Sequence, residues 1–157
     1  MDAHTYPDPS VEGFLNREFA LTHVSFDDRA PAARQILRTY RLLWSPGFVV
    51  LAPGGEEIRR FIGFQQPRDF LAELRLSLGK VALLGRDSST ALRLFREAAD
   101  LNPPAPVSPE ALYWAGVAAY RIDQGDLEYL RNYWQELRER FPESRWWTHA
   151  DVWDEGQ

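Results

Sequence analysis

The hydrophobic period of this chain changes near Pro67, and that change constrains the fold more than any other feature. Before Pro67, short apolar runs typical of strands alternate with helical stretches. After it, apolar residues recur three and four positions apart almost to the C-terminus, which is typical of helices packed against one another. We therefore predict an α/β domain over residues 1–84 and an all-α domain over residues 72–157, which share the helix over 67–84.

Helical and strand-like segments alternate before the change. Asp8 and Pro9 are typical of the N-cap and the first residue of a helix, here over residues 8–19. Residues 20–26 alternate between two sets of side chains, which predicts a strand. Residues 27–43 return to helical spacing and predict a second helix.

The segment from Leu42 to Phe64 indicates a helix end followed by a β-hairpin. Residues 47–52 (GFVVLA) form a continuous apolar run without charge, which favours a strand buried on both faces. Residues 53–55 (Pro-Gly-Gly) supply the turn, and residues 57–64 the return strand.

The second half predicts four helices and a short closing helix within residues 143–153. Ser108 is expected to cap the third of these helices, with Pro109 at its start. The apolar stripes are Ala91, Leu94, Phe95 and Ala98 in the second helix, and Leu127, Leu130, Trp134 and Leu137 in the fourth. Among the six tryptophans, we expect Trp146, Trp147 and Trp153 to cover the end of this core rather than to form a binding patch.

The helical half also repeats itself. The matching positions are Leu78, Gly79, Ala82, Ala91, Phe95, Ala98 and Pro103, followed by Ala115, Gly116, Leu130, Trp134, Leu137 and Pro142. A small residue in one helix lets the next helix cross closely, an aromatic residue fills the gap, and a proline ends the unit. Over about 70 residues, this half resembles tetratricopeptide repeats.

Such repeats usually hold a peptide in the concave face made by their first helices. In this register the second repeat would present Glu110, Tyr113, Val117, Tyr120 and Arg121 on that face. The alternative is that these residues pack on the first repeat. We favour the alternative, because two repeats make only a short groove.

The first half resembles the C-terminal part of a thioredoxin fold. A helix, an apolar residue, Ser45, Pro46, a strand, a glycine turn, a strand and a helix follow one another as they do after the family's active-site helix. Further matches upstream are Tyr6, Asp8, Val11, Leu15, Asn16 and Asp27. The resemblance covers residues 1–78 and implies a cis Ser45–Pro46 bond. It also implies that Trp44, Ser45 and Pro46 form a loop that binds an extended peptide.

The Cys-X-X-Cys motif of that family is missing, because the chain has no cysteine. In the family this motif lies just before the position of Met1, and its thiolate performs thiol–disulfide exchange. We therefore expect the chain as given to be redox-inactive and to need no cofactor. It is either part of a thiol–disulfide oxidoreductase that begins upstream, with a role in cell redox homeostasis, or a non-catalytic protein-binding or chaperone-like module.

We favour the first interpretation, because the missing strand of a thioredoxin sheet would lie between the strands near Val24 and Val49. Without it both strands lose a partner, and unpaired buried backbone groups are costly. The uncharged strand over 47–52 would then have an open edge. We expect a protein or peptide partner, or self-association, at that edge.

Other candidate sites are weaker. His4, His23 and His149 lack the spacing of metal ligands, so we expect no metal site. Asp27 and Asp28 could be an acid–base pair, but adjacent carboxylates after a strand more often cap the next helix.

The overall charge also narrows the range of partners. A net charge of −5 and a pI near 5.2 argue against nucleic acid, whose phosphates need a basic patch. No apolar run approaches the roughly 18 residues that a membrane span needs. The polar N-terminal segment is not a signal peptide, so by default we expect a cytoplasmic protein.

Overall fold

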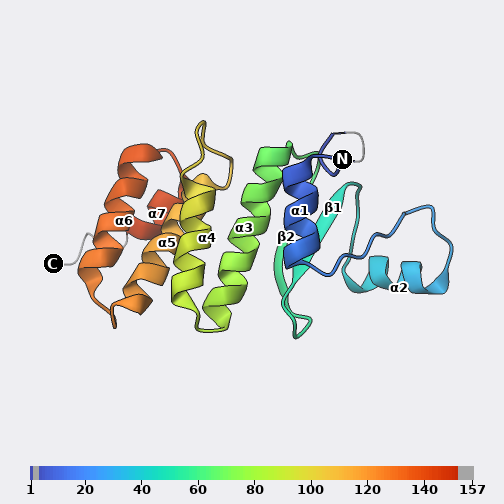
Figure 1. Cartoon of the computed structure of the whole chain (residues 1–157), viewed down its shortest axis with the longest axis horizontal. Coiled ribbons are helices and arrows are strands. Elements are labelled where there is room, and N and C mark those ends of the chain that lie inside the picture. The colour runs from blue at the N-terminus through green and yellow to red at the C-terminus, as the bar shows by residue number, and fades with distance from the viewer. Residues whose placement is uncertain (2–3, 152–157) are drawn as a thin grey trace. The chain divides into compact units, whose positions relative to one another are not determined.

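A computed structural model describes Met1 and residues 4–151 of the chain (Figure 1). The described part is mostly helical, with seven α-helices and one two-stranded antiparallel sheet, so the predicted mixed α/β character is confirmed. The contacts divide the chain into Met1–Phe70 and Leu71–Gln157, which we call the α/β unit and the helical unit. This division falls in the first turn of α3, inside the segment that the sequence assigned to both halves.

The α/β unit contains α1 (Pro9–Glu18), α2 (Pro31–Thr39), β1 (Gly47–Leu51), β2 (Glu57–Ile62) and the first turn of α3 (Pro67–Leu84). The helical unit contains the rest of α3 with α4 (Ser88–Ala99), α5 (Ser108–Ile122), α6 (Leu127–Arg140) and α7 (Arg145–Asp151).

Helix α1 begins as predicted. The Asp8 carboxylate accepts hydrogen bonds from the backbone N–H of Ser10 at 2.9 Å and of Val11 at 3.3 Å, and from the Ser10 hydroxyl. The hydrogen bond from the Ser10 hydroxyl, together with those from the two N–H groups, lowers the pKa of Asp8 although desolvation opposes the change. The helix then buries Val11, Phe14 and Leu15.

Strands β1 and β2 form the predicted hairpin. Their register pairs Gly47 with Ile62 and Val50 with Arg59, and a bulge follows Val50. The turn is closed by the N–H of Ala52, which donates to the Glu56 carbonyl at 2.8 Å. Gly55 has φ +88°, a conformation that favours glycine.

One face of the hairpin carries an aromatic cluster. The rings of Phe48 and Phe61 stack with centroids 4.7 Å apart, and Phe70 of α3 lies 5.0 Å from Phe48. Such pairs contribute about 0.5–1.5 kcal/mol beyond the area they bury. This cluster ties the first turn of α3 to the sheet within the α/β unit.

Two strand predictions are wrong in part. Residues 20–26 form no strand, and Leu21 is 59% exposed. A strand needs a partner for its backbone groups, and β1 and β2 pair only with each other in the described part of the chain. Strand β1 is not buried on both faces either, because Val50 is its only buried residue.

The helical unit has the packing that its spacing predicted. A Cβ atom on Gly79 of α3 would lie 2.4 Å from the Cε1 atom of Phe95 on α4. A Cβ atom on Gly116 of α5 would lie 3.0 Å from Cβ of Tyr133 and 3.2 Å from Cδ1 of Trp134, both on α6. Both helix pairs therefore cross where a glycine meets an aromatic ring.

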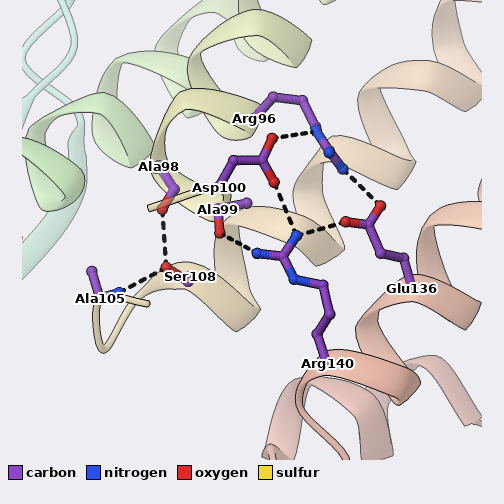
Figure 2. Close-up of polar contacts among 8 residues, drawn as sticks. All are labelled: Arg96, Ala98, Ala99, Asp100, Ala105, Ser108, Glu136 and Arg140. Atoms are coloured by element: carbon purple, nitrogen blue, oxygen red, sulfur yellow. Dashed lines mark hydrogen bonds and ion pairs between the residues drawn. The ribbon is translucent and has the colours of Figure 1, made fainter. Parts of the chain in front are cut away.

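Ser108 is not the predicted N-cap. Val107 precedes the helix, without a side-chain cap, and Ser108 is fully buried at the first helical position. Its hydroxyl donates to the Ala98 carbonyl at the end of α4 and accepts from the N–H of Ala105, both at 3.0 Å (Figure 2). The hydroxyl therefore joins the α4–α5 connection to the end of α4.

The C-terminal tryptophans behave as expected where the structure describes them. Trp146 and Trp147 of α7 are half-buried and pack against the core of the helical unit. Trp153 lies outside the described residues.

Candidate functional site

The loop between α2 and β1 starts from a tight helix end. Arg41 has φ +47°, and the N–H of Leu42 donates to the Leu37 carbonyl at 2.9 Å. A residue in this left-handed conformation, followed by such a backbone bond, is a common way to end a helix, although glycine usually occupies the position. The chain then enters the loop over residues 43–46.

That loop contains the predicted Trp44, Ser45 and Pro46. The Ser45–Pro46 peptide bond is cis, as the sequence resemblance implied, and a second cis bond that was not predicted precedes Pro103. Gly47 is required directly after the loop, because a Cβ atom there would lie 2.8 Å from the Trp44 carbonyl oxygen. The glycine thus lets the loop fold closely over the start of β1.

The register of the hairpin shows which backbone groups of β1 have partners. The N–H of Gly63 donates to the Pro46 carbonyl at 2.8 Å, so residue 46 faces β2. Because hydrogen-bonding residues alternate along an antiparallel strand, Phe48 and Val50 also face β2. The backbone groups of Gly47, Val49 and Leu51 therefore point away from β2. No described strand pairs with that side of β1, which we call the free edge.

Large apolar side chains are exposed at the same end of the hairpin. Leu43 and Trp44 of the loop are 84% and 70% exposed. Ile62 pairs directly with Gly47, and Phe64 follows one residue after Gly63; both are exposed as well. We call these four residues the apolar rim. The backbone of the free edge can pair with an extended polypeptide, and the apolar rim beside it can contact alternate side chains of that polypeptide.

The predicted groove residues of the helical unit have partners within that unit. Glu110 is buried, and its carboxylate lies 2.5 Å from the Lys80 ammonium of α3. The Arg121 guanidinium donates to the Leu83 carbonyl of α3 at 3.2 Å. These contacts support the interpretation that the face of α5 packs on the first helix pair.

The remaining groove residues are partly buried. The Tyr113 ring stacks on Trp134 with centroids 5.1 Å apart, and burial raises the pKa of its hydroxyl. Val117 and Tyr120 are half-buried and pack against the core of the unit. Packing is therefore the better account of this face than an open peptide groove.

An ion-pair network that the sequence analysis did not predict links α4 and α6 (Figure 2). Arg96 of α4 contacts Glu136 of α6 at 2.7 Å, and Arg140 of α6 contacts Asp100 after α4 at 2.9 Å. Arg140 also contacts Glu136 at 2.6 Å and donates to the Ala99 carbonyl at 2.8 Å. Helical periodicity places Glu136 and Arg140 on the same side of α6. No local sequence pattern predicts their partners Arg96 and Asp100, which lie 40 residues earlier in the chain.

This network perturbs the groups that form it. Burial alone would raise the pKa of Glu136, but hydrogen bonds from Arg96 and Arg140 outweigh it and lower that pKa. Burial alone would lower the pKa of the Arg96 guanidinium, but the hydrogen bond and the charge of Glu136 outweigh it and raise that pKa. The side chains of Arg96, Asp100, Glu136 and Arg140 pair with one another, so the network links α4 to α6 and is not a site for a ligand. We call this network the α4–α6 brace.

Catalytic groups are few in the described residues. The chain has no thiol, and no group of histidine and acidic residues in residues 4–151 could hold a metal ion. Asp28 accepts the N–H of Ala30 at 2.8 Å, which forms a turn just before α2. The expected capping role is wrong, because Ala30 is the N-cap of α2 and no side chain caps the helix. Among the described helices, none is long and apolar enough to cross a membrane.

Comparison with known proteins gave no match, whether to family models, to curated proteins or to solved structures.

Proposed function

We propose that this protein is a thioredoxin-like protein-binding module that pairs an extended segment of a partner protein with the free edge of β1. The observation that carries the proposal is the row of backbone groups at Gly47, Val49 and Leu51 that no described strand pairs, next to the exposed Leu43 and Trp44. Addition of a strand to an open edge gives affinity through the main chain and specificity through side-chain contacts. The chain supplies binding and no thiol chemistry, because it has no cysteine.

Trp44, Ser45 and Pro46 would align the partner at the start of the edge. The backbone of this loop is held by the contact between the Pro46 carbonyl and the N–H of Gly63. The indole of Trp44 is free to cover an apolar side chain of the incoming segment, and burying such an aromatic side chain contributes roughly 1.5–3 kcal/mol.

The helical unit would act as a tetratricopeptide-like support. Its two helix pairs use equivalent glycine–aromatic contacts, at Gly79 with Phe95 and at Gly116 with Trp134. The ion pairs of Arg96 and Arg140 hold the second helices together. We assign the helical unit a scaffolding role, and the free edge carries the binding.

A second candidate function assigns the same edge to redox chemistry. The position of Pro46 directly before an open strand favours it, because in the thioredoxin family a proline at this place faces the active site. The added strand would then carry Cys-X-X-Cys, and the chain would be part of a thiol–disulfide oxidoreductase. The two candidates share the free edge and differ in whether the strand that occupies it bears a thiol.

The test removes one backbone donor of the free edge. In Val49→Pro the outward N–H is lost, while the bonds from Phe48 and Val50 to β2 stay, since proline is tolerated on an edge strand. The matched control is Val49→Thr, which keeps the N–H and a β-branched side chain. The probe is a fluorescein-labelled peptide of alternating threonine and valine, and the readout is fluorescence anisotropy.

The proposal predicts that the peptide binds to the original chain and to Val49→Thr, and that Val49→Pro weakens binding by about fivefold or more, the effect of one lost hydrogen bond. Circular dichroism checks that all three proteins keep the same helix content. Equal affinity of the peptide for the original chain, Val49→Thr and Val49→Pro would contradict the proposal. Attaching a Cys-X-X-Cys pair to the peptide and assaying reductase activity then distinguishes the second candidate from the first.

A further inference from the structure

Helix α2 and the residues beside it carry a positive charge that stands out in an acidic chain. Residues 29–41 contain four arginines and no acidic residue, whereas the whole chain has a net charge of −5. The four are Arg29, Arg34, Arg38 and Arg41, and all are exposed.

These arginines differ from most others because their side chains have no partner among the described residues. Most guanidinium groups elsewhere are engaged, as in Arg60 with Glu57 at 2.6 Å and Arg75 with Glu97 at 3.1 Å. Within the described residues, no carboxylate, carbonyl or aromatic ring engages the side chains of the four arginines around α2. The nearest acidic group along the chain, Asp28, accepts the N–H of Ala30 instead.

The charge is concentrated along one cleft. An open cleft of about 360 Å³ runs along α2 and is lined by Arg29, Pro31, Arg34, Gln35, Arg38 and Thr39. Gln35 and Thr39 add neutral hydrogen-bond donors between the guanidinium groups. The opposite face of α2 contains the buried Ala33 and the half-buried Ile36 and Leu37, which fixes the basic face toward solvent.

We propose that this cleft binds an acidic segment of a partner polypeptide, through carboxylates that pair with Arg34 and Arg38. These two residues lie one helical turn apart, a rise of about 6 Å. In an extended peptide, alternate side chains lie on the same side and about 6.6 Å apart, so two glutamates separated by one residue match the spacing. The planar guanidinium also suits bidentate pairing with a carboxylate.

Two other anionic partners fit the cleft less well. Single-stranded nucleic acid binds through aromatic side chains that stack on bases, and no aromatic residue lines this cleft. A helix that lies on a membrane exposes its apolar face to the lipid, whereas α2 turns Ala33, Ile36 and Leu37 away from solvent. The proposal does not depend on the free edge of β1, because it uses different residues and ion pairing instead of strand pairing.

The test measures binding of a fluorescein-labelled peptide of alternating glutamate and serine, by anisotropy at low salt, where screening is weakest. Arg34→Glu/Arg38→Glu should weaken binding by about tenfold or more, because two attractions become two repulsions. The matched control is Arg86→Glu/Arg131→Glu, which makes the same charge change at two exposed arginines of the helical unit. It should change the affinity by less than about twofold, because it leaves all the residues that line the cleft unchanged.

The charge-reversal variant could weaken binding because it folds poorly. Arg34→Gln/Arg38→Gln therefore serves as a second variant, because it removes the two charges without adding repulsion, and it should still weaken binding. The proposal is overturned if the peptide does not bind, or if the control weakens binding as much as the α2 variants do. It is also overturned if inorganic phosphate displaces the peptide completely at millimolar concentration. Labelled oligothymidine and phosphatidylserine vesicles are tested in the same way. If either binds more tightly than the peptide, and the α2 variants abolish that binding, the partner is nucleic acid or membrane and the proposal is overturned.

Discussion

Gly79 of α3 lies against the ring of Phe95 of α4 so closely that a Cβ atom on residue 79 would come within 2.4 Å of the ring. Phe95 is fully buried, so its ring has little room to move. Gly116 and Trp134 repeat the relation in the next helix pair with more space, at 3.2 Å. The core of the helical unit is therefore set at two equivalent crossings, of which the first is the tighter.

Gly79→Ala should lower the free energy of unfolding of the helical unit by about 1–3 kcal/mol. Displacing a fully buried ring costs more than the roughly 1 kcal/mol that alanine gains over glycine in a helix. Gly116→Ala should cost less than Gly79→Ala, about 1 kcal/mol or less. Its Cβ atom would lie 3.0 Å from Cβ of Tyr133, so α6 has to shift by only a few tenths of an ångström, and the helix propensity of alanine offsets part of that cost. Urea unfolding followed by circular dichroism measures both.

A matched control for these substitutions is Gly13→Ala in α1, where a Cβ atom would meet nothing within 4 Å. This change should be neutral or stabilising by up to about 1 kcal/mol, since only helix propensity acts. If Gly79→Ala were as harmless as Gly13→Ala, the close crossing of α3 and α4 would be wrong.

Lys80→Met should destabilise the helical unit by about 3 kcal/mol, because it removes a cation from the buried Glu110 carboxylate. Lys80→Met/Glu110→Met should recover much of that loss, since the buried carboxylate is then absent. Thermal unfolding of the two variants compares them. A double variant that is less stable than the single one would contradict this account of the pair.

The α4–α6 brace should lose its effect in acid. The pKa of Glu136 is lower in the folded chain than its ordinary value of 4.5, so the ionised form stabilises the fold. Its contribution is complete above that ordinary value and is lost as the pH falls through the lowered folded-state pKa. We expect about 0.5–1 kcal/mol, as for a partly exposed ion pair.

Stability measured across the acid range in Glu136→Gln checks this prediction. The variant should lose stability relative to the original chain at neutral pH and converge with it in acid. Glu139→Gln on the same helix is the control, because Glu139 contacts Gln135 and no arginine of the brace. Equal pH profiles for the original chain and Glu136→Gln would contradict the role of Glu136.

The chain alone should show no disulfide reductase activity in an insulin turbidity assay, because it contains no thiol. A clean preparation that precipitates insulin faster than buffer would refute the view that the chain itself performs no thiol chemistry.

Local signals predicted the helices well. Asp8 and Pro9 begin α1, and the glycine–aromatic spacing of the helical unit gives the crossings at Gly79 and Gly116, since these features depend on neighbours within one or two turns. Ser108 was misassigned because a serine before a proline has the local signature of a cap, whereas its hydroxyl is used by Ala98 and Ala105.

Predictions that depend on distant partners were less successful. Residues 20–26 alternate like a strand, but in the described structure no neighbouring strand pairs with them. The apolar run of β1 indicated burial on both faces, which requires layers that the two-stranded sheet does not have. The Arg96 and Arg140 pairs, and the absence of partners for the arginines of α2, depend on side chains that meet only after folding.

Hydrogen exchange along β1, followed residue by residue by NMR in dilute protein, tests the central claim most directly. In the free protein, the amides of Phe48 and Val50 should exchange slowly and those of Val49 and Leu51 quickly, because only the first pair bonds to β2. Addition of the threonine–valine peptide should slow exchange at Val49 and Leu51. If these two amides are already protected in the free protein, or stay fast when the peptide is bound, the free edge of β1 is not the binding site.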